Sequence, residues 1–516
     1  MEQSSGNLFA LLDGSDDLPA IVDGDRAWSR EQLRNVSRQT AHYLKSLGLR
    51  RGDVLAVWLP NVPAWLQLLF AASSVGVLVV PISTRYKPPE VEHALRVSRA
   101  KILVCPESFL GQAFSDTADK LAAVLPDLEL VVPLDDLRDW LPTVSDTGVL
   151  AADSENESSP DDLLCCFSTS GTTGFPKLAA HDHAGIARHA SLVATAFQFE
   201  PGDRLLASLP FYGVFGLVAA LAALAGGAAC DLMLIYRADE AAAMIDQRGI
   251  THVIGSDSMF DPILAVGGCQ FKSWRRIAQA DFIGLSLEVT EEADKYGIKS
   301  SGTYGSSEVF SLISFWPFDG SPKERARSGG VPIDPLMRFR ICDPETGGLV
   351  QAGDAGELQI RGPNVFAEYL NNPEASANAF TDDGWFRTGD MARAEGDGFV
   401  YLARLGDGLR LRGYLVNPAE IELVLMQHPA VSGAQVVGVT RPGQADVAVA
   451  FVIQEPAAAA AVESELMAYC KSEMAAFKLP ERIQTVEHFP SVDGPNGNKI
   501  QKRVLREMAA ELIAQA

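Results

Sequence analysis

The chain has 516 residues, of which 47% are hydrophobic and 21% are charged, so it is a globular protein too long for a single hydrophobic core. Its 66 acidic and 43 basic residues give a formal net charge of −23, which argues against a nucleic-acid or anionic-membrane partner. The seven cysteines form no CxxC motif and no Cys/His pair at metal-ligand spacing, which indicates reduced thiols.

Two long stretches without charged residues, 54–84 and 211–230, are candidates for membrane spans. A spanning helix needs about 20 consecutive apolar residues. Pro60, Pro63 and Pro81 interrupt the first stretch, and glycines interrupt the second. We therefore expect buried strands and helices of a cytoplasmic protein without stable membrane insertion, and the N-terminal residues do not have the pattern of a signal peptide.

Strand-like and helix-like runs alternate early in the chain. The expected elements are strand 54–59, helix 63–74, strand 77–82, helix 90–98 and strand 101–105. This order predicts parallel strands with helices on the faces of the sheet. A polar, acidic connection follows at 143–162, and the alternation resumes over 218–256.

After residue 330 the pattern changes to short runs separated by Gly, Pro and Asn, which indicates smaller antiparallel sheets. A compact C-terminal region begins near residue 404. The expected elements there are helix 419–427, strand 434–439, strand 447–453 and helix 464–474.

The segment STSGTTGFPK, residues 168–177, combines hydroxyl side chains, two glycines and a lysine after a strand-like run. Backbone N–H groups, hydroxyl donors and one cation are the groups that bind a polyphosphate. It is not a Walker A loop, because Lys177 follows proline and precedes Leu178, where that motif has Ser or Thr. A flexible Ser/Thr/Gly loop explains the composition equally well.

Three further motifs follow. YGSSE, residues 304–308, places an aromatic ring beside glycine and a carboxylate four residues later, which suits base stacking and Mg²⁺ binding. GWFRTGD ends in Asp390, which suits two ribose hydroxyls, with Arg404 fourteen residues later. DGPNGNKIQK presents Lys499, a cation suited to a forming acyl phosphate. Taken singly, these motifs also fit ordinary turns and a solvated surface lysine.

In their order and spacing, these motifs resemble those of the adenylate-forming superfamily, which contains acyl-CoA synthetases, adenylation domains of peptide synthetases and insect luciferases. STSGTTGFPK is similar to its phosphate loop, YGSSE to its adenine and magnesium motif, WFRTGD to its ribose motif and GNKIQK to its C-terminal lysine motif. ARLGDGLRLRGYLVNPAEIE resembles its domain junction. The resemblance covers essentially the whole chain.

The resemblance implies an α/β fold class with two domains. Residues 1–405 would form a large N-terminal domain of stacked mixed sheets with flanking helices, and residues 406–516 a small, mobile α+β lid. It also implies ATP, Mg²⁺ and coenzyme A (CoA) as cofactors. A carboxylic acid would be adenylated, and its acyl group would then pass to the CoA thiol. Monomer and homodimer both remain open.

Residue roles carry over by position. The implied catalytic residues are Lys499, Glu308 and Thr172, of which Glu308 and Thr172 would hold Mg²⁺. The implied nucleotide-binding residues are Ser168, Thr169, Ser170, Gly171, Thr172, Thr173, Gly174, Lys177, Gly302, Thr303, Tyr304, Gly305, Ser306, Ser307, Asp390 and Arg404. The implied acid-binding residues are Phe211, Tyr212, Gly213, Phe215, Asp281 and Gly284, and Gly406 would be the hinge.

Four positions depart from the family pattern. Gly406 replaces an Asp or Lys at the hinge, which keeps backbone freedom but removes a polar latch. Gly213 replaces a His, which leaves either open space or a place for Tyr212 to fill. Asp281 lies where the family has a Gly-Ala-Pro loop, and it either selects an acid with an amino or hydroxyl group or is an exposed loop residue. Gly302 replaces an Asn that contacts adenine.

We therefore predict an AMP-forming acid–CoA ligase. Phe211, Tyr212 and Phe215 suggest an apolar pocket for an aryl or aliphatic acid. The alternative is a stand-alone enzyme that loads the phosphopantetheine thiol of a carrier protein. A luciferase-like oxygenase and a catalytically idle acyl-nucleotide-binding protein have less support, because Lys499, Glu308 and Asp390 are all present and nothing indicates oxygen chemistry.

Overall fold

The computed structural model describes residues 8–13, 17–137, 158–169, 176–405, 409–411, 414–416, 418–439, 447–456, 461–474, 476–494 and 497–514. The chain forms two compact units. Unit 1 contains residues 1–338 and 360–386, and unit 2 contains residues 339–359 and 387–516. The boundary expected between residues 405 and 406 concerns a movable lid, and it stays a prediction.

The first sheet of unit 1 has seven strands. Their spatial order is β20 (Glu368–Tyr369), β10 (Leu178–Asp182), β9 (Leu163–Ser168), β4 (Leu78–Pro81), β3 (Val54–Val57), β5 (Ile102–Pro106) and β8 (Leu130–Leu134). β3 pairs in parallel with β4 and β5, and α2 (Pro63–Val75) and α3 (Pro88–Ser98) connect these strands. The parallel alternation expected in this part of the chain is confirmed.

The second sheet of unit 1 is also mostly parallel. Its strands within this unit follow the order β17 (Gly329–Pro332), β16 (Ser314–Phe315), β15 (Lys299–Tyr304), β14 (Arg276–Ala280), β13 (His252–Ser256), β11 (Arg204–Ala207), β12 (Ala229–Leu232), β1 (Pro19–Asp23) and β2 (Arg26–Ser29). The pairings from β15 through β1 are parallel, and those at both ends are antiparallel. The helices of this part are α5 (His183–Ala196), α6 (Val214–Ala225), α7 (Ala238–Arg248), α8 (Asp257–Leu264) and α9 (Ser286–Lys295).

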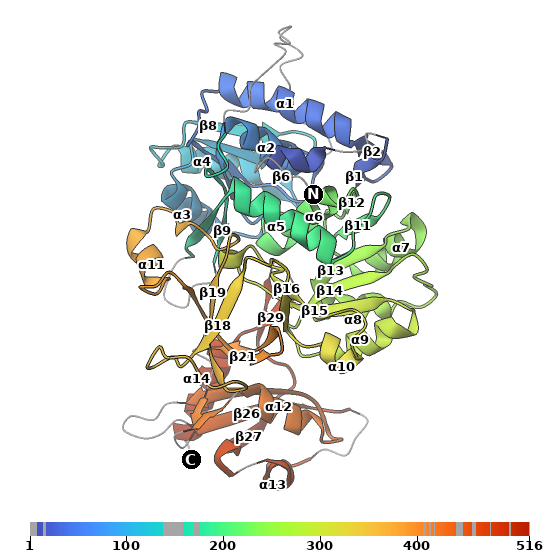
Figure 1. The fold of residues 1–516 in the computed structure, drawn as a ribbon, viewed down its shortest axis with the longest axis vertical. Coiled ribbons are helices and arrows are strands. Elements are labelled where there is room, and N and C mark those ends of the chain that lie inside the picture. The colour runs from blue at the N-terminus through green and yellow to red at the C-terminus, as the bar shows by residue number, and fades with distance from the viewer. Residues whose placement is uncertain are drawn as a thin grey trace. The chain divides into compact units, whose positions relative to one another are not determined.

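The two uncharged stretches are core elements. α2 and α6 are buried along almost their whole length, since apolar residues surround both helices instead of forming one stripe. Figure 1 shows α2 beside α1 (Arg30–Ser46) and α6 beside α5, pairs that are in contact. Within the described part of the chain, no helix has the length and apolar character that crossing a membrane requires.

Unit 2 combines antiparallel strands with a small α+β region. The strands are β18 (Arg338–Cys342), β19 (Ala355–Arg361), β21 (Phe386–Glu395) and β22 (Gly398–Arg404), followed by the β23–β24 hairpin (Leu409–Leu411 and Tyr414–Val416). A three-stranded sheet then contains β25 (Val431–Val439), β26 (Val447–Gln454) and β27 (Arg482–Thr485), with α12 (Pro418–Met426), α13 (Glu463–Glu473) and α14 (Lys502–Ala514). The C-terminal helices and strands expected from the sequence are confirmed.

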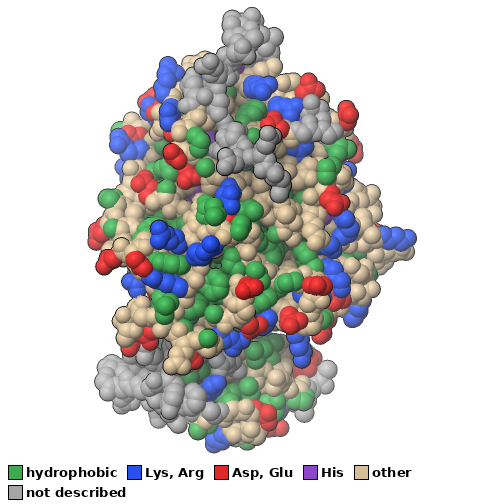
Figure 2. All heavy atoms as spheres, in the orientation of Figure 1, with side chains coloured by type: hydrophobic (Ala, Val, Ile, Leu, Met, Phe, Trp, Pro, Cys, Tyr) green, Lys and Arg blue, Asp and Glu red, His purple; other side chains and the backbone are tan. Residues whose placement is uncertain are grey.

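On the face drawn in Figure 2, acidic and basic side chains are interspersed among apolar and polar ones. Many are paired across elements, such as Arg188 with Asp334 at 2.7 Å and Arg51 with Asp162 at 2.8 Å. The negative net charge is therefore spread over a mixed surface.

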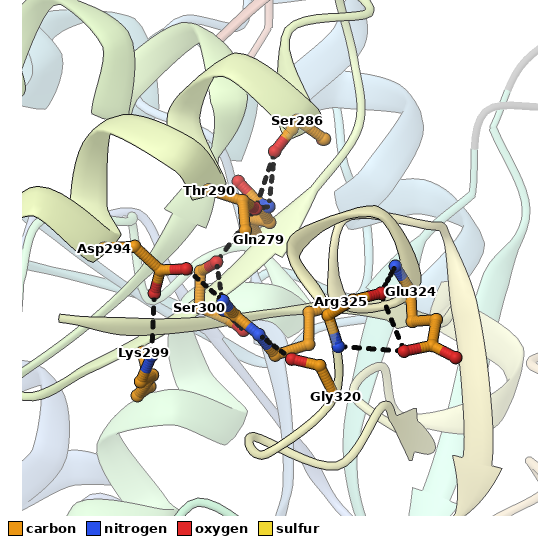
Figure 3. A network of polar contacts seen from close by, with 10 residues as sticks. Gln279, Ser286, Thr290, Asp294, Lys299, Ser300, Gly320, Glu324 and Arg325 are labelled. Carbon is orange, nitrogen blue, oxygen red and sulfur yellow. Dashed lines mark hydrogen bonds and ion pairs between the residues drawn. The ribbon is translucent and has the colours of Figure 1, made fainter. Parts of the chain in front are cut away.

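A buried arginine fixes the strand that leads to the YGSSE motif (Figure 3). Arg325, at the end of α10 (Pro322–Arg325), is 1% exposed. Its guanidinium donates to the carbonyls of Ser300 and Gly320, both at 2.9 Å, and to the carboxylate of Asp294 at 2.5 Å. Because Ser300 lies in β15 and Asp294 in α9, the network holds this strand against its covering helix.

We expect Arg325→Met to lower the free energy of unfolding by about 3–5 kcal/mol, because it removes the donor to two carbonyls and leaves Asp294 paired with Lys299 alone. Urea unfolding followed by tryptophan fluorescence measures this loss. Lys323→Met on the same short helix is the control, because Lys323 is exposed and its variant should unfold like the wild type. An unchanged unfolding midpoint for Arg325→Met would contradict the expectation.

Candidate active site

Three neighbouring parallel strands bring their carboxyl ends to one edge of the second sheet. β13, β14 and β15 pair in register, with Ser256 opposite Ala280 and Gln279 opposite Gly302. In open α/β sheets, ligands bind outside the carboxyl ends of such strands. The residues that follow these ends are Asp257, Asp281 and the YGSSE motif. The tertiary structure thus places two acidic residues beside the predicted adenine motif.

The predicted phosphate loop connects β9 to β10 at the other sheet of unit 1. Ser168 pairs with Leu178, and the N–H of Thr169 donates to the carbonyl of Lys177 at 2.8 Å, which closes the base of the loop. Ser170, Gly171, Thr172, Thr173 and Gly174 lie outside the described residues, so the roles predicted for them stay predictions.

Tyr369 links the end of this loop to Glu308. The ammonium of Lys177 lies 4.4 Å from the centre of the Tyr369 ring, and the Tyr369 hydroxyl donates to the Glu308 carboxylate at 2.9 Å. β20 holds Tyr369 beside β10, where it pairs with Ala179. A cation, a phenol and a carboxylate are therefore contiguous at the base of the predicted phosphate loop. Sequence reasoning missed Tyr369, since it lies outside all the motifs considered.

The glycines of the adenine motif are required by close backbone packing. A Cβ on Gly302 would lie 2.1 Å from the carbonyl oxygen of Arg327, and one on Gly305 would lie 2.4 Å from Cα of Ser311. No side chain fits at either position. The departure at Gly302 therefore follows from the close approach of Arg327, and an amide at this position would collide with that backbone.

The hydroxyl groups near Tyr304 have distinct environments. Thr303 donates to the carbonyl of Ser314 at 2.8 Å, and Ser307 donates to the carbonyl of Ser168 at 3.2 Å. The hydroxyl of Ser306 is buried and has no hydrogen-bond partner in the described structure. Thr303 and Ser307 thus hold the fold, whereas the nucleotide-binding role predicted for Ser306 stays a prediction.

A single carboxylate is a fitting donor for Mg²⁺ at this site. Mg²⁺ usually keeps several waters and binds through one or two carboxylates together with substrate phosphates. Among the described residues there is no cluster of three or more His, Cys, Asp or Glu side chains suited to holding a metal. Glu308 therefore fits a metal carried in with a nucleotide.

A second acidic group shapes the loop that follows β14. The buried carboxylate of Asp257 accepts N–H groups from Ser258, Phe282, Ile283 and Leu285, at 2.8–3.1 Å. One side chain thereby fixes the conformation of the whole 281–285 loop. Sequence analysis did not single out Asp257.

Asp281 is exposed as a residue, but its carboxyl group lies close to that of Asp257. Desolvation, reinforced by the neighbouring Asp257 carboxylate, raises the pKa of Asp281 to about 7. The carboxyl also accepts the N–H of Gly284 at 2.9 Å, and Gly284 has a φ of +85°, which favours glycine. Near neutral pH the carboxyl group of Asp281 is therefore partly protonated.

The other four residues predicted to bind the acid lie at the start of α6 or just before it. Gly213 is the N-cap of this helix, Phe215 is buried, and Tyr212 is half-buried. Phe211 is fully buried and packs edge-on against Trp65, with ring centres 5.8 Å apart. Phe211 therefore supports the wall of any pocket here through core packing.

The ribose motif lies in unit 2. Asp390 and Arg404 face each other across the β21–β22 pair, and the Arg404 guanidinium donates to the Asp390 carboxylate at 2.8 Å. Asp390 is only 4% exposed. The two residues that were predicted to act together are therefore neighbours.

The C-terminal lysine lies in a two-stranded hairpin of unit 2. Lys499 belongs to β29 (Gly497–Ile500) and pairs with Val492 of β28 (Ser491–Gly494), while its side chain is outside the described structure. Gly406 also lies outside the described residues. The catalytic and hinge roles of these two residues stay predictions.

Two family models match the chain. The model of the AMP-binding enzyme matches residues 11–370, and the model of the AMP-binding enzyme C-terminal domain matches residues 420–493. The first match alone spans well over half of the chain. The recognition of an adenylate-forming enzyme from its motifs is confirmed.

Similar proteins are ligases. A mitochondrial medium-chain acyl-CoA ligase, ACSF2 of Danio rerio, is 30% identical over 94% of this chain and 84% of its own length. A feruloyl-CoA synthase of an Amycolatopsis species is 29% identical over 92% of each chain.

Solved structures agree with these relatives. ATP-bound MatB from Rhodopseudomonas palustris superimposes with a TM-score of 0.85, at 26% identity over 98% of this chain and 99% of that one. The anthranilate CoA ligase AuaEII in complex with anthranoyl-AMP gives a TM-score of 0.82, at 26% identity over 99% and 98%. The chain belongs to the AMP-binding enzyme family, as an acyl-CoA synthetase-type ligase of the adenylate-forming superfamily.

Proposed function

We propose that this ligase activates an apolar carboxylic acid, either aryl or aliphatic, with ATP and Mg²⁺, and transfers the acyl group to CoA. The observation that carries the proposal is the contiguous group of Lys177, Tyr369 and Glu308 at the base of the phosphate loop. It supplies a cation for phosphate and an oriented carboxylate for a metal.

In the first half-reaction, an oxygen of the acid attacks the α-phosphorus of ATP, and the bond to the β-phosphate bridging oxygen breaks. The products are an acyl-AMP and pyrophosphate. Bound Mg²⁺ would neutralise the charge that develops on the departing oxygens. The protein's part is positioning: Glu308 would hold the metal while Tyr369 donates to the Glu308 carboxylate, and Lys177 would attract the phosphates.

Two further residues are proposed to contact the substrates. Asp390 would accept hydrogen bonds from the ribose hydroxyls, with Arg404 orienting the carboxylate. Lys499 would bridge the attacking carboxylate and the α-phosphate. In the second half-reaction the CoA thiolate attacks the acyl carbonyl, the carbon–oxygen bond to phosphate breaks, and AMP leaves. Rotation near Gly406 would withdraw Lys499 between the two steps.

The proposed class of acid is based on residues of the 281–285 loop and of the start of α6. Phe282 of this loop exposes its aromatic ring, and Tyr212 and Phe215 lie at the start of α6. Apolar walls with a few polar groups suit aryl and aliphatic acids. The similar enzymes named for feruloyl, medium-chain acyl and anthranilate substrates fall in this class.

The cellular setting is part of the proposal. All seven cysteines are free thiols, and six of them are buried. Free thiols are typical of a reducing compartment, so we place the ligase in the cytoplasm.

ATP–pyrophosphate exchange over a panel of benzoates, cinnamates and short to long fatty acids tests the proposed function. We expect exchange with one class of acid, and AMP together with a thioester only when CoA is added. Exchange with no CoA-dependent turnover would favour a carrier-protein thiol as the acceptor. Failure of every acid to support exchange would contradict the proposal.

Removing the carboxylate of Glu308 should impair adenylation. We expect Glu308→Gln to slow exchange by about 100-fold and to raise the Mg²⁺ concentration for half-maximal rate. Tyr369→Phe should slow exchange by about tenfold, because it removes only a hydrogen bond to a charged group. Tyr296→Phe, at an exposed tyrosine of the same unit, is the control. Wild-type rates in both variants would rule out the roles assigned to Glu308 and Tyr369.

Replacing Lys499 should separate the two half-reactions. We expect Lys499→Ala to slow acyl-AMP formation by about 100-fold or more, while thioester formation from supplied acyl-AMP stays within about threefold of wild type. Stopped assays of each half-reaction measure the split, and Lys471→Ala at the surface of α13 is the control. Equal losses in the two half-reactions would refute the assignment.

A further inference from the structure

We propose that His181 and His189 are positioning residues for adenylation, because their ring N–H groups hold the backbone of the segment that carries Glu308. The inference rests on the proposed role of Glu308 and deepens it. The segment 305–312 follows β15 and contains a single helical turn, Ser307–Val309, with Glu308 at its centre.

The backbone of this segment is strained. Phe310, Ser311 and Leu312 have φ angles of 57°, 57° and 48°, and none of them is glycine. Consecutive residues with side chains rarely adopt the left-handed region, and such strain persists only where surrounding contacts hold it. The close approach of Ser311 to Gly305 depends on this backbone conformation.

Two buried histidines hold the segment at both ends. Nε2 of His181, in β10, lies 2.7 Å from the carbonyl oxygen of Ser307, and Nε2 of His189, in α5, lies 2.7 Å from the carbonyl oxygen of Ser311. A carbonyl oxygen only accepts hydrogen bonds, so each Nε2 must carry the proton. Glu308 lies between these two fixed carbonyls.

Two donors from a more distant segment complete the contacts. The side-chain amide of Asn364 donates to the carbonyl of Val309 at 2.8 Å, and the N–H of Phe366 donates to the carbonyl of Glu308 at 2.7 Å. Four carbonyls of the 307–311 turn are therefore bound from outside the turn. Its position is set by these neighbours, since its own backbone conformation is unfavourable.

The ring of Phe310 fills the space between the two histidines. Its centre lies 5.1 Å from that of His181 and 6.0 Å from that of His189, with edge-on geometry in both cases. Burial lowers the pKa of each histidine to about 4, so both rings are neutral near pH 7. Each ring thus combines apolar packing with one directed N–H donor, which an aliphatic side chain cannot supply.

Substitutions that remove or retain the donor test this role. His181→Leu and His189→Leu remove the N–H, whereas His181→Gln and His189→Gln place an amide donor near the position of Nε2. Should a Leu variant not fold, the corresponding Asn variant keeps an amide that is too short to reach the carbonyl. The matched control is His252→Leu, because His252 is also buried and bonded to a backbone carbonyl, that of Phe197, in another part of the unit.

Two measurements report on Glu308 separately from folding. The first is the rise in unfolding temperature caused by MgATP relative to ATP with EDTA, which needs no turnover. The second is the Mg²⁺ concentration for half-maximal pyrophosphate exchange. We expect both Leu variants to lose most of the MgATP-specific rise and to need at least tenfold more Mg²⁺. The Gln variants should stay within threefold of the wild type, and His252→Leu should lower the unfolding temperature without changing the Mg²⁺ requirement.

Each alternative result overturns a defined claim. Leu variants that behave like His252→Leu would show that the two histidines only stabilise the fold. Gln variants as defective as the Leu variants would show that the N–H donor is not what matters. If Glu308→Gln itself leaves the Mg²⁺ requirement unchanged, the role proposed for Glu308 fails. If Glu308→Gln raises that requirement and the histidine variants do not, only the present inference fails.

Discussion

Parallel pairing of β13, β14 and β15 is the constraint on which the site depends. Backbone hydrogen bonds keep these strands in register, so their carboxyl ends lie along one edge. The residues that follow the carboxyl ends of these strands therefore lie at the same edge of the sheet, even when they are far apart in the sequence. Asp257, Asp281 and Tyr304 come together in this way. The Arg325 network holds the start of β15 against α9, which covers the sheet.

Close backbone packing then converts this edge into a shaped site. Gly302 and Gly305 allow other main-chain segments to approach within distances that no side chain would tolerate. The left-handed residues after Glu308 are unfavourable by themselves, and buried hydrogen bonds from outside the turn offset their strain. The same arrangement recurs in the 281–285 loop, where the Asp257 carboxylate binds three N–H groups. Buried side chains thus hold irregular backbone that could not hold itself.

The charged groups at the site differ from the net charge of the molecule, which is negative. A net charge of −23 disfavours the binding of polyanions in general, yet a nucleoside triphosphate is a polyanion. In the proposed mechanism, Lys177, held against the Tyr369 ring, and the phosphate loop would attract the nucleotide at short range. The Glu308 carboxylate would repel the phosphates unless a metal ion lay between them. The net charge of the whole protein therefore does not decide which ligand charge the site would bind.

The sequence by itself determined the family, the alternation of strands and helices in unit 1, and the positions of the motifs. These features are encoded by residues that are near neighbours, such as the Ser/Thr/Gly run at 168–174 and the YGSSE turn. Only the tertiary structure decided which distant groups act on those motifs. Tyr369 lies 61 residues from Glu308, and His181 and His189 lie 126 and 122 residues from the carbonyls they bind. A hydrogen bond between such partners leaves no periodic trace in one sequence, because sheet pairing and helix packing, and not chain neighbourhood, bring its two atoms together.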